Sequence, residues 1–361
     1  MKNLLSNPSG MAAIAALISL GTVFLGIAFT ESSEPVPQSG KVLGLAFQSV
    51  NVSSLERSVN YYKTLGFNLV GDANPPWTGD EAANRLYKTP GAMSRTAVLS
   101  LPSSASGKPF ILYLREYKGF DRHSRANFPA RDPSSCHFGM LVPDADTLWA
   151  QMKSMGILRA LSWDAKLVRM PGQSSGGIAY VMDPDGFNIE IIGVKLPPTA
   201  GERKSAQDHP SLHHVGLAVL NSGKSKGFYG DLLGAKFPDT LPEWVSGDMY
   251  DAAVGGRGFV IRLINGSFPE AAAPLSEMRF ELVEYQKPTR QDVPEYSISD
   301  IAVSSVGFQV EGLDALYSRL KAAGISAWSG GGVVQKKDGT RAVVVRDPDV
   351  GAFVELFEKS P

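Results

Sequence analysis

Short alternating apolar segments, each followed by a helical segment that ends at a glycine, occur four times along the chain. The first is residues 42–52 (VLGLAFQSVNV), where Ser53 and Ser54 offer a helix cap before a helical run that reaches Leu65 and stops at Gly66. The same order returns for residues 137–142 with a helix through Met155 and Gly156, for residues 214–219 with a helix through Leu233 and Gly234, and for residues 305–310 with a helix at 313–323 and Gly324.

Each unit then continues as short strands between turn signals and ends on a distinctive apolar strand. These closing strands are residues 110–114 (FILYL), 187–192 (FNIEII), 279–283 (RFELV) and 353–357 (FVELF). The third unit repeats the first, because His214 follows Phe47 by 167 residues and Glu281 follows Tyr113 by 168. The fourth repeats the second in the same way, and a DPD turn precedes the closing strand of both.

The pattern therefore predicts an α+β protein of four modules, each with one strand, one helix and about three further strands (βαβββ). One such open, curved sheet has too little core to be stable alone, so we expect the modules to pair into two curved sheets. Residues 41–198 are expected to form a first domain from modules 1 and 2, and residues 199–361 a second domain from modules 3 and 4.

Composition narrows the function classes. The chain has 361 residues, of which 43% are hydrophobic and 20% charged, and its formal net charge is -1, so nothing in it favours nucleic acid as a partner. Cys136 is the single cysteine, which excludes an intrachain disulfide framework and a multi-cysteine zinc site. The function classes that remain are an enzyme that acts on a small molecule and a protein that binds another molecule. The sequence leaves the oligomeric state open.

The N-terminal segment predicts export. Residues 11–29 are apolar and uncharged over a length that can span a bilayer as a helix, Lys2 precedes them, and Glu31 and Glu34 follow them. We expect residues 1–40 to be a hydrophobic anchor or signal with a linker, and we favour an uncleaved membrane anchor over a cleaved signal peptide. The predicted location is periplasmic or extracellular.

One histidine in the third opening strand has room above it. Side chains alternate between the two faces of a strand, so His214, Gly216 and Ala218 share one face while His213 points to the other. A single strand histidine is more often a structural residue than a ligand. Only a set of further ligand-type residues would change that interpretation.

The sequence resembles the vicinal oxygen chelate superfamily of glyoxalases, bleomycin-resistance proteins and extradiol dioxygenases. The resemblance covers nearly all of residues 41–358. It rests on residues 137–142 (HFGMLV), residues 214–219 (HVGLAV), residues 53–58 with Tyr61, Tyr62 and 65–67 (LGF), and residues 183–190 (DPDGFNIE). In that superfamily, βαβββ modules pair to enclose a metal site, and each module offers one inward position on its opening strand and one on its closing strand.

The resemblance places these inward positions on specific residues. They are Phe47 and Tyr113 in module 1, His137 and Glu190 in module 2, His214 and Glu281 in module 3, and Ser305 and Glu355 in module 4. If neighbouring modules pair, each of two sites is incomplete. If module 2 pairs with module 3 and module 1 with module 4, all four metal ligands meet at one site.

We favour the second pairing, with His137, Glu190, His214 and Glu281 holding one divalent ion (zinc, nickel, manganese or ferrous iron). Glu355 is then expected to be an ordinary carboxylate that faces water. Trp244, Tyr250, Arg257 and Arg262 lie in the part of module 3 where pocket residues occur in such a fold.

The resemblance implies an enzyme that stabilises an enolate or enediolate of a small molecule with neighbouring oxygens, as a lyase or isomerase of glyoxalase or epimerase type. Glu190 or Glu281 would shuttle the proton. One alternative is a ferrous extradiol dioxygenase that uses His137, His214 and Glu281. Another is a non-catalytic protein that binds a small molecule, for which the aromatic pair Phe47 and Tyr113 is the candidate cavity.

Overall fold

The computed structural model describes residues 40–104, 108–125, 130–169, 176–193, 209–268, 278–288 and 295–359. The predicted anchor at residues 11–29 lies outside the described residues, so the membrane and export assignments stay predictions. Within the described ranges, none of the helices combines the length and the apolar character that a membrane span requires.

Each module begins with a strand and a helix, as predicted. Module 1 consists of β1 (Lys41–Val52), α1 (Leu55–Thr64), β2 (Asn68–Val70), α2 (Glu81–Tyr87), β3 (Met93–Pro102) and β4 (Pro109–Lys118). Module 2 consists of β5 (Cys136–Val142), α3 (Ala145–Ser154), the short helix η1 (Trp163–Ala165), β6 (Gly177–Met182) and β7 (Asn188–Gly193). Module 3 consists of β8 (Ser211–Val219), α5 (Ser222–Lys226), η2 (Gly227–Leu232), β9 (Val245–Ser246), α6 (Asp248–Val254), β10 (Val260–Gly266) and β11 (Arg279–Lys287). Module 4 consists of β12 (Ser304–Glu311), α7 (Leu313–Ala322), β13 (Val334–Gln335), β14 (Arg341–Arg346) and β15 (Phe353–Glu358).

The helix ends confirm the stop signals in the sequence. Gly66, Gly156, Gly234 and Gly324 follow the four helices and have φ values between 68° and 98°, a left-handed conformation that glycine adopts without steric cost. The inserted helices α2 and α6 were not predicted. Asp80 caps α2 by accepting hydrogen bonds from the amides of Ala82 and Ala83, which is a start signal that the sequence did offer.

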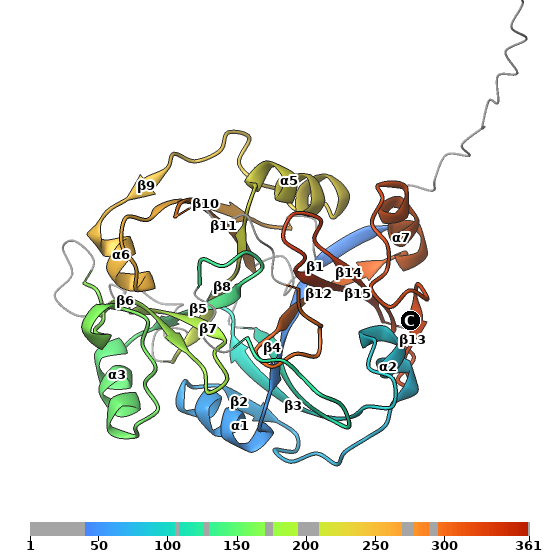
Figure 1. The fold of residues 1–361 in the computed structure, drawn as a ribbon, viewed down its shortest axis with the longest axis horizontal. Coiled ribbons are helices and arrows are strands. Elements are labelled where there is room, and N and C mark those ends of the chain that lie inside the picture. Colours follow the sequence, from blue (N-terminus) through green and yellow to red (C-terminus); the bar gives the residue numbers. More distant parts are fainter. Residues whose placement is uncertain are drawn as a thin grey trace, which may run out of the picture. The chain divides into compact units, whose positions relative to one another are not determined.

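The modules pair across the two halves of the chain. One sheet has the strand order β13-β14-β15-β12-β1-β4-β3-β2 and joins module 4 to module 1, and the other has the order β6-β7-β5-β8-β11-β10-β9 and joins module 2 to module 3 (Figure 1). The antiparallel pair β1–β12 lies at the centre of the first sheet, and the antiparallel pair β5–β8 lies at the centre of the second. The favoured pairing is therefore confirmed. The boundary predicted near residue 198 separates the sequence repeats, and each sheet takes one module from either side of it.

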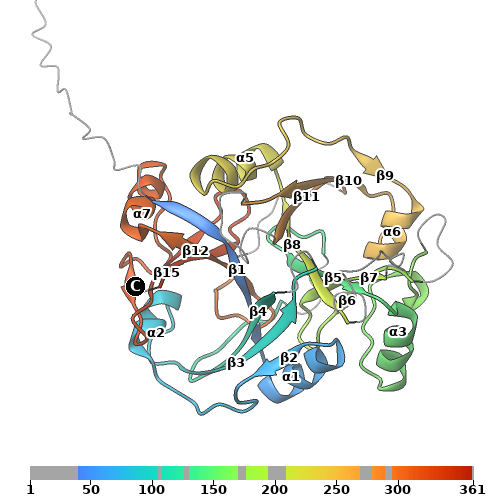
Figure 2. The ribbon, with the colours of Figure 1, turned by 180° about the vertical axis from the view of Figure 1, so that it is seen from behind.

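One face of each sheet packs on helices in a shared core. In both views of the ribbon, α1, α3, α5 and α7 lie outside the strands (Figures 1 and 2). Tyr62 of α1 packs on Phe138 of β5 at 6.2 Å between ring centroids, and Phe280 of β11 packs on Phe308 of β12 at 6.1 Å. Both contacts join the two sheets, and they leave the opposite face of each sheet free for chemistry.

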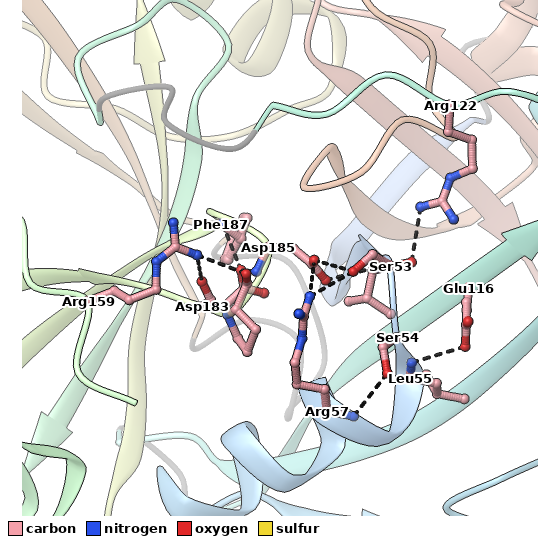
Figure 3. A network of polar contacts seen from close by, with 12 residues as sticks. Ser53, Ser54, Leu55, Arg57, Glu116, Arg122, Arg159, Asp183, Asp185 and Phe187 are labelled. Atoms are coloured by element: carbon pink, nitrogen blue, oxygen red, sulfur yellow. Dashed lines mark hydrogen bonds and ion pairs between the residues drawn. The ribbon is translucent and has the colours of Figure 1, made fainter. Parts of the chain in front are cut away.

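Two buried aspartates connect modules that lie in different sheets. Asp185, after β6, accepts hydrogen bonds from the amide and hydroxyl of Ser53 at 2.9 and 2.5 Å and pairs with Arg57 at 2.7 Å (Figure 3). Asp349 repeats this arrangement in the other half, where it accepts from the amides of Leu220 and Asn221 at 2.9 and 2.8 Å. Each DPD turn thus fixes the start of the helix in the preceding module of the same half, which belongs to the other sheet.

We predict that Asp185→Ala and Asp349→Ala each lower the free energy of unfolding by about 1–3 kcal/mol, because each change leaves partly buried amide donors without their acceptor. Chemical denaturation measures the effect. Asp239→Ala is the control, since Asp239 is exposed and its replacement should stay within about 0.5 kcal/mol of the parent. A loss for either variant no larger than that of the control would contradict the role of these contacts.

Candidate metal centre

Two histidines meet where β5 and β8 pair. In the antiparallel register, His137 lies opposite Gly216 and His214 opposite Gly139. A Cβ atom at Gly216 would lie 2.0 Å from the His137 ring, and one at Gly139 would lie 2.2 Å from the His214 ring. Each imidazole therefore covers the glycine of the neighbouring strand, and the room expected beside His214 is filled by His137.

The closing strands bring two glutamates to the same face. Glu190 on β7 pairs with Gly139, and Glu281 on β11 pairs with Gly216, both in parallel register. The exposed fractions of His137, His214, Glu190 and Glu281 are 3%, 4%, 7% and 8%. The structure thus brings all four predicted ligands together in one buried place on the sheet of modules 2 and 3.

The four side chains direct ligand-type atoms at one another. The Nε2 atoms of His137 and His214 are 3.1 Å apart. An oxygen of Glu190 lies 3.1 Å from Nε2 of His214 and 3.9 Å from that of His137, and an oxygen of Glu281 lies 3.6 and 3.9 Å from the same two atoms.

These separations fit metal coordination. Bonds of about 2.0–2.2 Å from one ion to nitrogen and oxygen place neighbouring ligand atoms roughly 3.0–3.5 Å apart. His137, His214 and Glu281 all have ligand atoms within 4.8 Å of one another, so this triad can hold a divalent ion. Glu190 lies close enough to both imidazoles to serve as a fourth ligand.

Burial and mutual charge set the protonation of the cluster. Burial, together with the positive charge of His214, lowers the pKa of His137 to about 3, so its imidazole is neutral at pH 7. Burial opposes the charged form of His214, but the carboxylates of Glu281 and Glu190 outweigh it and raise the His214 pKa. Burial raises the pKa of Glu281 to about 6. For Glu190 the hydrogen bond and charge of His214 outweigh burial and lower the pKa.

His213 supports His214, and the prediction that it points to the opposite face was wrong. Met140 pairs with Leu212 while Gly139 pairs with His214, so His213 is the extra residue of a β-bulge and alternation fails there. Its Nδ1 lies 2.9 Å from Nδ1 of His214, and Arg279 donates to its Nε2 at 3.1 Å. Burial, followed by the charge of His214, lowers the pKa of His213 to about 4, so His213 is neutral beside His214 at pH 7.

Two tyrosines complete the cluster, and the sequence interpretation missed both. The hydroxyl of Tyr180 lies 3.3 Å from Nε2 of His137, because Tyr180 pairs with Glu190 across β6 and β7. Burial, followed by the charges of Glu281 and Glu190, raises the pKa of Tyr285. Strand alternation around Glu190 and Glu281 was the signal that could have identified them.

Arg262, which lies between the helix and the closing strand of module 3, does not face the four ligands. Arg262 pairs with Glu284 across β10 and β11 and forms an ion pair with it at 3.6 Å, whereas Glu281 pairs with Asn265. Because Glu284 and Glu281 are three residues apart on one strand, they face opposite sides of the sheet. Arg262 therefore lies on the face away from the ligands, where its guanidinium stacks 4.0 Å from the Trp244 ring.

The equivalent positions of the other sheet carry no such ligand set. Phe47 covers Gly307 as His214 covers Gly139, and Tyr113 lies beside it with ring centroids 5.0 Å apart. Glu355 does not face water as predicted, because it is 0% exposed and pairs with Lys336 at 2.5 Å. Ser305 pairs with Ser49 across the centre of the sheet.

A family model for the glyoxalase/bleomycin resistance protein/dioxygenase superfamily matches residues 44–191 and 211–356. The chain therefore belongs to this superfamily, with one match in each half. A comparison with curated protein sequences found no match.

Solved structures agree in fold. A mutant of glyoxalase I from Zea mays aligns with a TM-score of 0.51 at 20% identity over 89% of this chain and 94% of that one. Glyoxalase I from Zea mays itself aligns with a TM-score of 0.50 at 20% identity over 89% of this chain and 92% of that one. A putative dioxygenase from Bacillus subtilis subsp. subtilis str. 168 aligns with a TM-score of 0.51 at 11% identity over 89% and 86%. The α+β fold of two mixed, curved sheets is thus that of glyoxalase I.

We predict that Gly139→Ala and Gly216→Ala each weaken divalent metal binding by about 10–100-fold, because the added methyl group displaces the imidazole above it. Titration of the metal-stripped protein with Zn²⁺ or Ni²⁺ measures this. Gly307→Ala is the matched control: it displaces Phe47 in the other sheet, where a Cβ would lie 2.2 Å from the ring, and should leave metal affinity unchanged. Equal effects of all three variants would show a general loss of structure instead.

Proposed function

We propose that this chain is a metal-dependent enzyme that holds one divalent ion between modules 2 and 3, with His137, His214, Glu281 and Glu190 as ligands. The observation that carries the proposal is the burial of two carboxylates whose ion-pair partners, among the described residues, are imidazoles alone. His137 is neutral, and even a positively charged His214 leaves the two glutamates with an excess of negative charge. Burying such a set is costly unless a cation joins it.

The other sheet supports this interpretation, because there the same closing-strand position has cations of its own. Glu355 pairs with Lys336 at 2.5 Å and lies 3.9 Å from Arg115. Glu190 is the counterpart of Glu355 in the repeat, and its described ion pairs are with His137 and His214. The chain thus neutralises one buried glutamate with its own side chains and leaves the other to a metal ion.

A divalent ion held there supplies Lewis-acid stabilisation of negative charge that develops on two neighbouring substrate oxygens. The residues of the chain supply the proton transfer. Glu281 has a pKa raised to about 6 by burial, which suits a group that accepts and returns a proton near neutral pH. Glu190, whose pKa is lowered, is the better permanent ligand. Tyr180 can donate a hydrogen bond beside His137.

The reaction class we favour is a lyase or isomerase of glyoxalase or epimerase type acting on a small molecule with neighbouring oxygens. Extradiol cleavage by ferrous iron is the second candidate, because His137, His214 and Glu281 have ligand atoms within 4.8 Å of one another and make the two-histidine, one-carboxylate set that suits that metal. For either reaction we propose that the substrate is a small molecule. We also propose that the enzyme acts outside the cytoplasm, as the apolar segment at residues 11–29 predicts.

We predict that His137→Ala and His214→Ala each weaken metal binding by more than about 100-fold, which exceeds the loss typical of changes to supporting residues. Elemental analysis of the purified protein after dialysis gives the number of ions per chain. Ser305→Ala alters the position equivalent to His137 in the other sheet and serves as control. Full metal content in either histidine variant would refute the shared site.

Metal identity and oxygen dependence separate the two reactions. For the lyase or isomerase, we expect turnover of α-hydroxycarbonyl or thiohemiacetal substrates that persists without oxygen, with zinc, nickel or manganese in the protein. Parallel assays on catechols under air measure the alternative. Iron content together with oxygen uptake on catechols would overturn the favoured reaction and support the dioxygenase.

A further inference from the structure

A cavity lies on the sheet of modules 1 and 4, at the place equivalent to the metal centre. Its volume is about 640 Å³, within the range of sites that bind small molecules. The residues of its wall that matter here are Phe47, Tyr113, Arg115, Lys336 and Phe357. Phe47 and Tyr113 stand where His214 and Glu281 stand in the other sheet.

The aromatic side chains in the wall of the cavity pack against one another. Phe47 contacts Tyr113 edge to face, with ring centroids 5.0 Å apart and an interplanar angle of 77°. It also packs on Phe357 at 5.4 Å. Such a wall suits an apolar, flat ligand, since aromatic pairs gain energy from edge-to-face and offset contacts.

Two cations line the same cavity and stand in front of a buried carboxylate. Glu355 accepts hydrogen bonds from Lys336 at 2.5 Å and from the Tyr87 hydroxyl at 2.7 Å, and Arg115 approaches it at 3.9 Å. Glu355 is fully buried and does not line the cavity, whereas Lys336 and Arg115 do. The ammonium and guanidinium groups therefore separate the glutamate from the space where a ligand would lie.

The charge at the back of this cavity is not balanced by the protein. Lys336 and Arg115 carry two positive charges against the single negative charge of Glu355. Asp338 and Lys359 also line the wall, and their opposite charges leave the sum unchanged. The guanidinium group of Arg115 has five N–H donors. Its hydrogen bond with Tyr117 and its 3.9 Å ion pair with Glu355 use only some of them. A compact anion would complete the set.

We propose that this cavity binds a small aromatic carboxylate without a metal ion, its ring against Phe47 and Tyr113 and its carboxylate on Lys336 and Arg115. Module duplication then yields two unlike sites, one for a metal ion and one for an organic acid. The proposal does not depend on the metal centre. A cluster that only neutralises Glu355 is the alternative explanation.

Calorimetric titration of the full-length chain with 2-naphthoate tests the proposal, and 2-naphthamide is the matched neutral probe. We expect one saturable site for the carboxylate that persists in EDTA, so that failure of the metal proposal would leave this result unchanged. Lys336→Gln should weaken 2-naphthoate binding about tenfold or more, and leave amide binding as it was. Lys153→Gln, an exposed change on α3, is the control.

Glu355→Gln provides a test in the opposite direction. Removing the internal anion frees Lys336 and Arg115, so 2-naphthoate should bind about tenfold more tightly. If either variant fails to fold, NMR titration of the unmodified protein decides, with shift changes expected at Phe47 and Tyr113. Absence of saturable carboxylate binding, shift changes elsewhere, or equal affinity of folded Lys336→Gln and the parent would overturn the proposal.

Discussion

Burying a carboxylate on the face of a β-sheet costs several kcal/mol unless cations or hydrogen-bond donors offset the lost hydration. Both sheets of this protein bury glutamates at the same closing-strand position, Glu190 in one and Glu355 in the other. Each sheet therefore has a buried negative charge that other groups must offset. Lys336, Arg115 and Tyr87 offset the charge of Glu355. Glu190 and Glu281 have only two imidazoles as described ion-pair partners, and burial keeps that of His137 neutral.

Pairing across the halves makes this difference possible. If each half had formed its own sheet, His137 and His214 would lie on separate sheets, and neither sheet would have a complete ligand set. The antiparallel contact of β5 with β8 instead places each histidine over a glycine of the other strand. Asp185 and Asp349 then hold the modules of each half together although those modules belong to different sheets. The site and the fold therefore depend on the same long-range contacts.

Much of this arrangement could be predicted from the sequence, because its signals are local and repeated. Alternation within strands, a glycine after each helix and a nearly constant offset between repeats were enough to identify the four modules. The resemblance to the vicinal oxygen chelate superfamily then placed the inward positions at His137, Glu190, His214 and Glu281. The remainder depends on contacts that no local pattern encodes. The β-bulge at His213 interrupts alternation, and Lys336 lies in a turn whose distance from Glu355 is set only by the folded sheet.

The central claim is that one sheet holds a metal ion and the other does not. Anomalous diffraction from crystals of the full chain loaded with Mn²⁺ or Zn²⁺ tests it directly, because the position of each ion appears without assumptions about activity. The account predicts one anomalous peak per chain, between Nε2 of His137 and Nε2 of His214. A peak beside Glu355, or a fully loaded crystal with no peak at the two histidines, would contradict it.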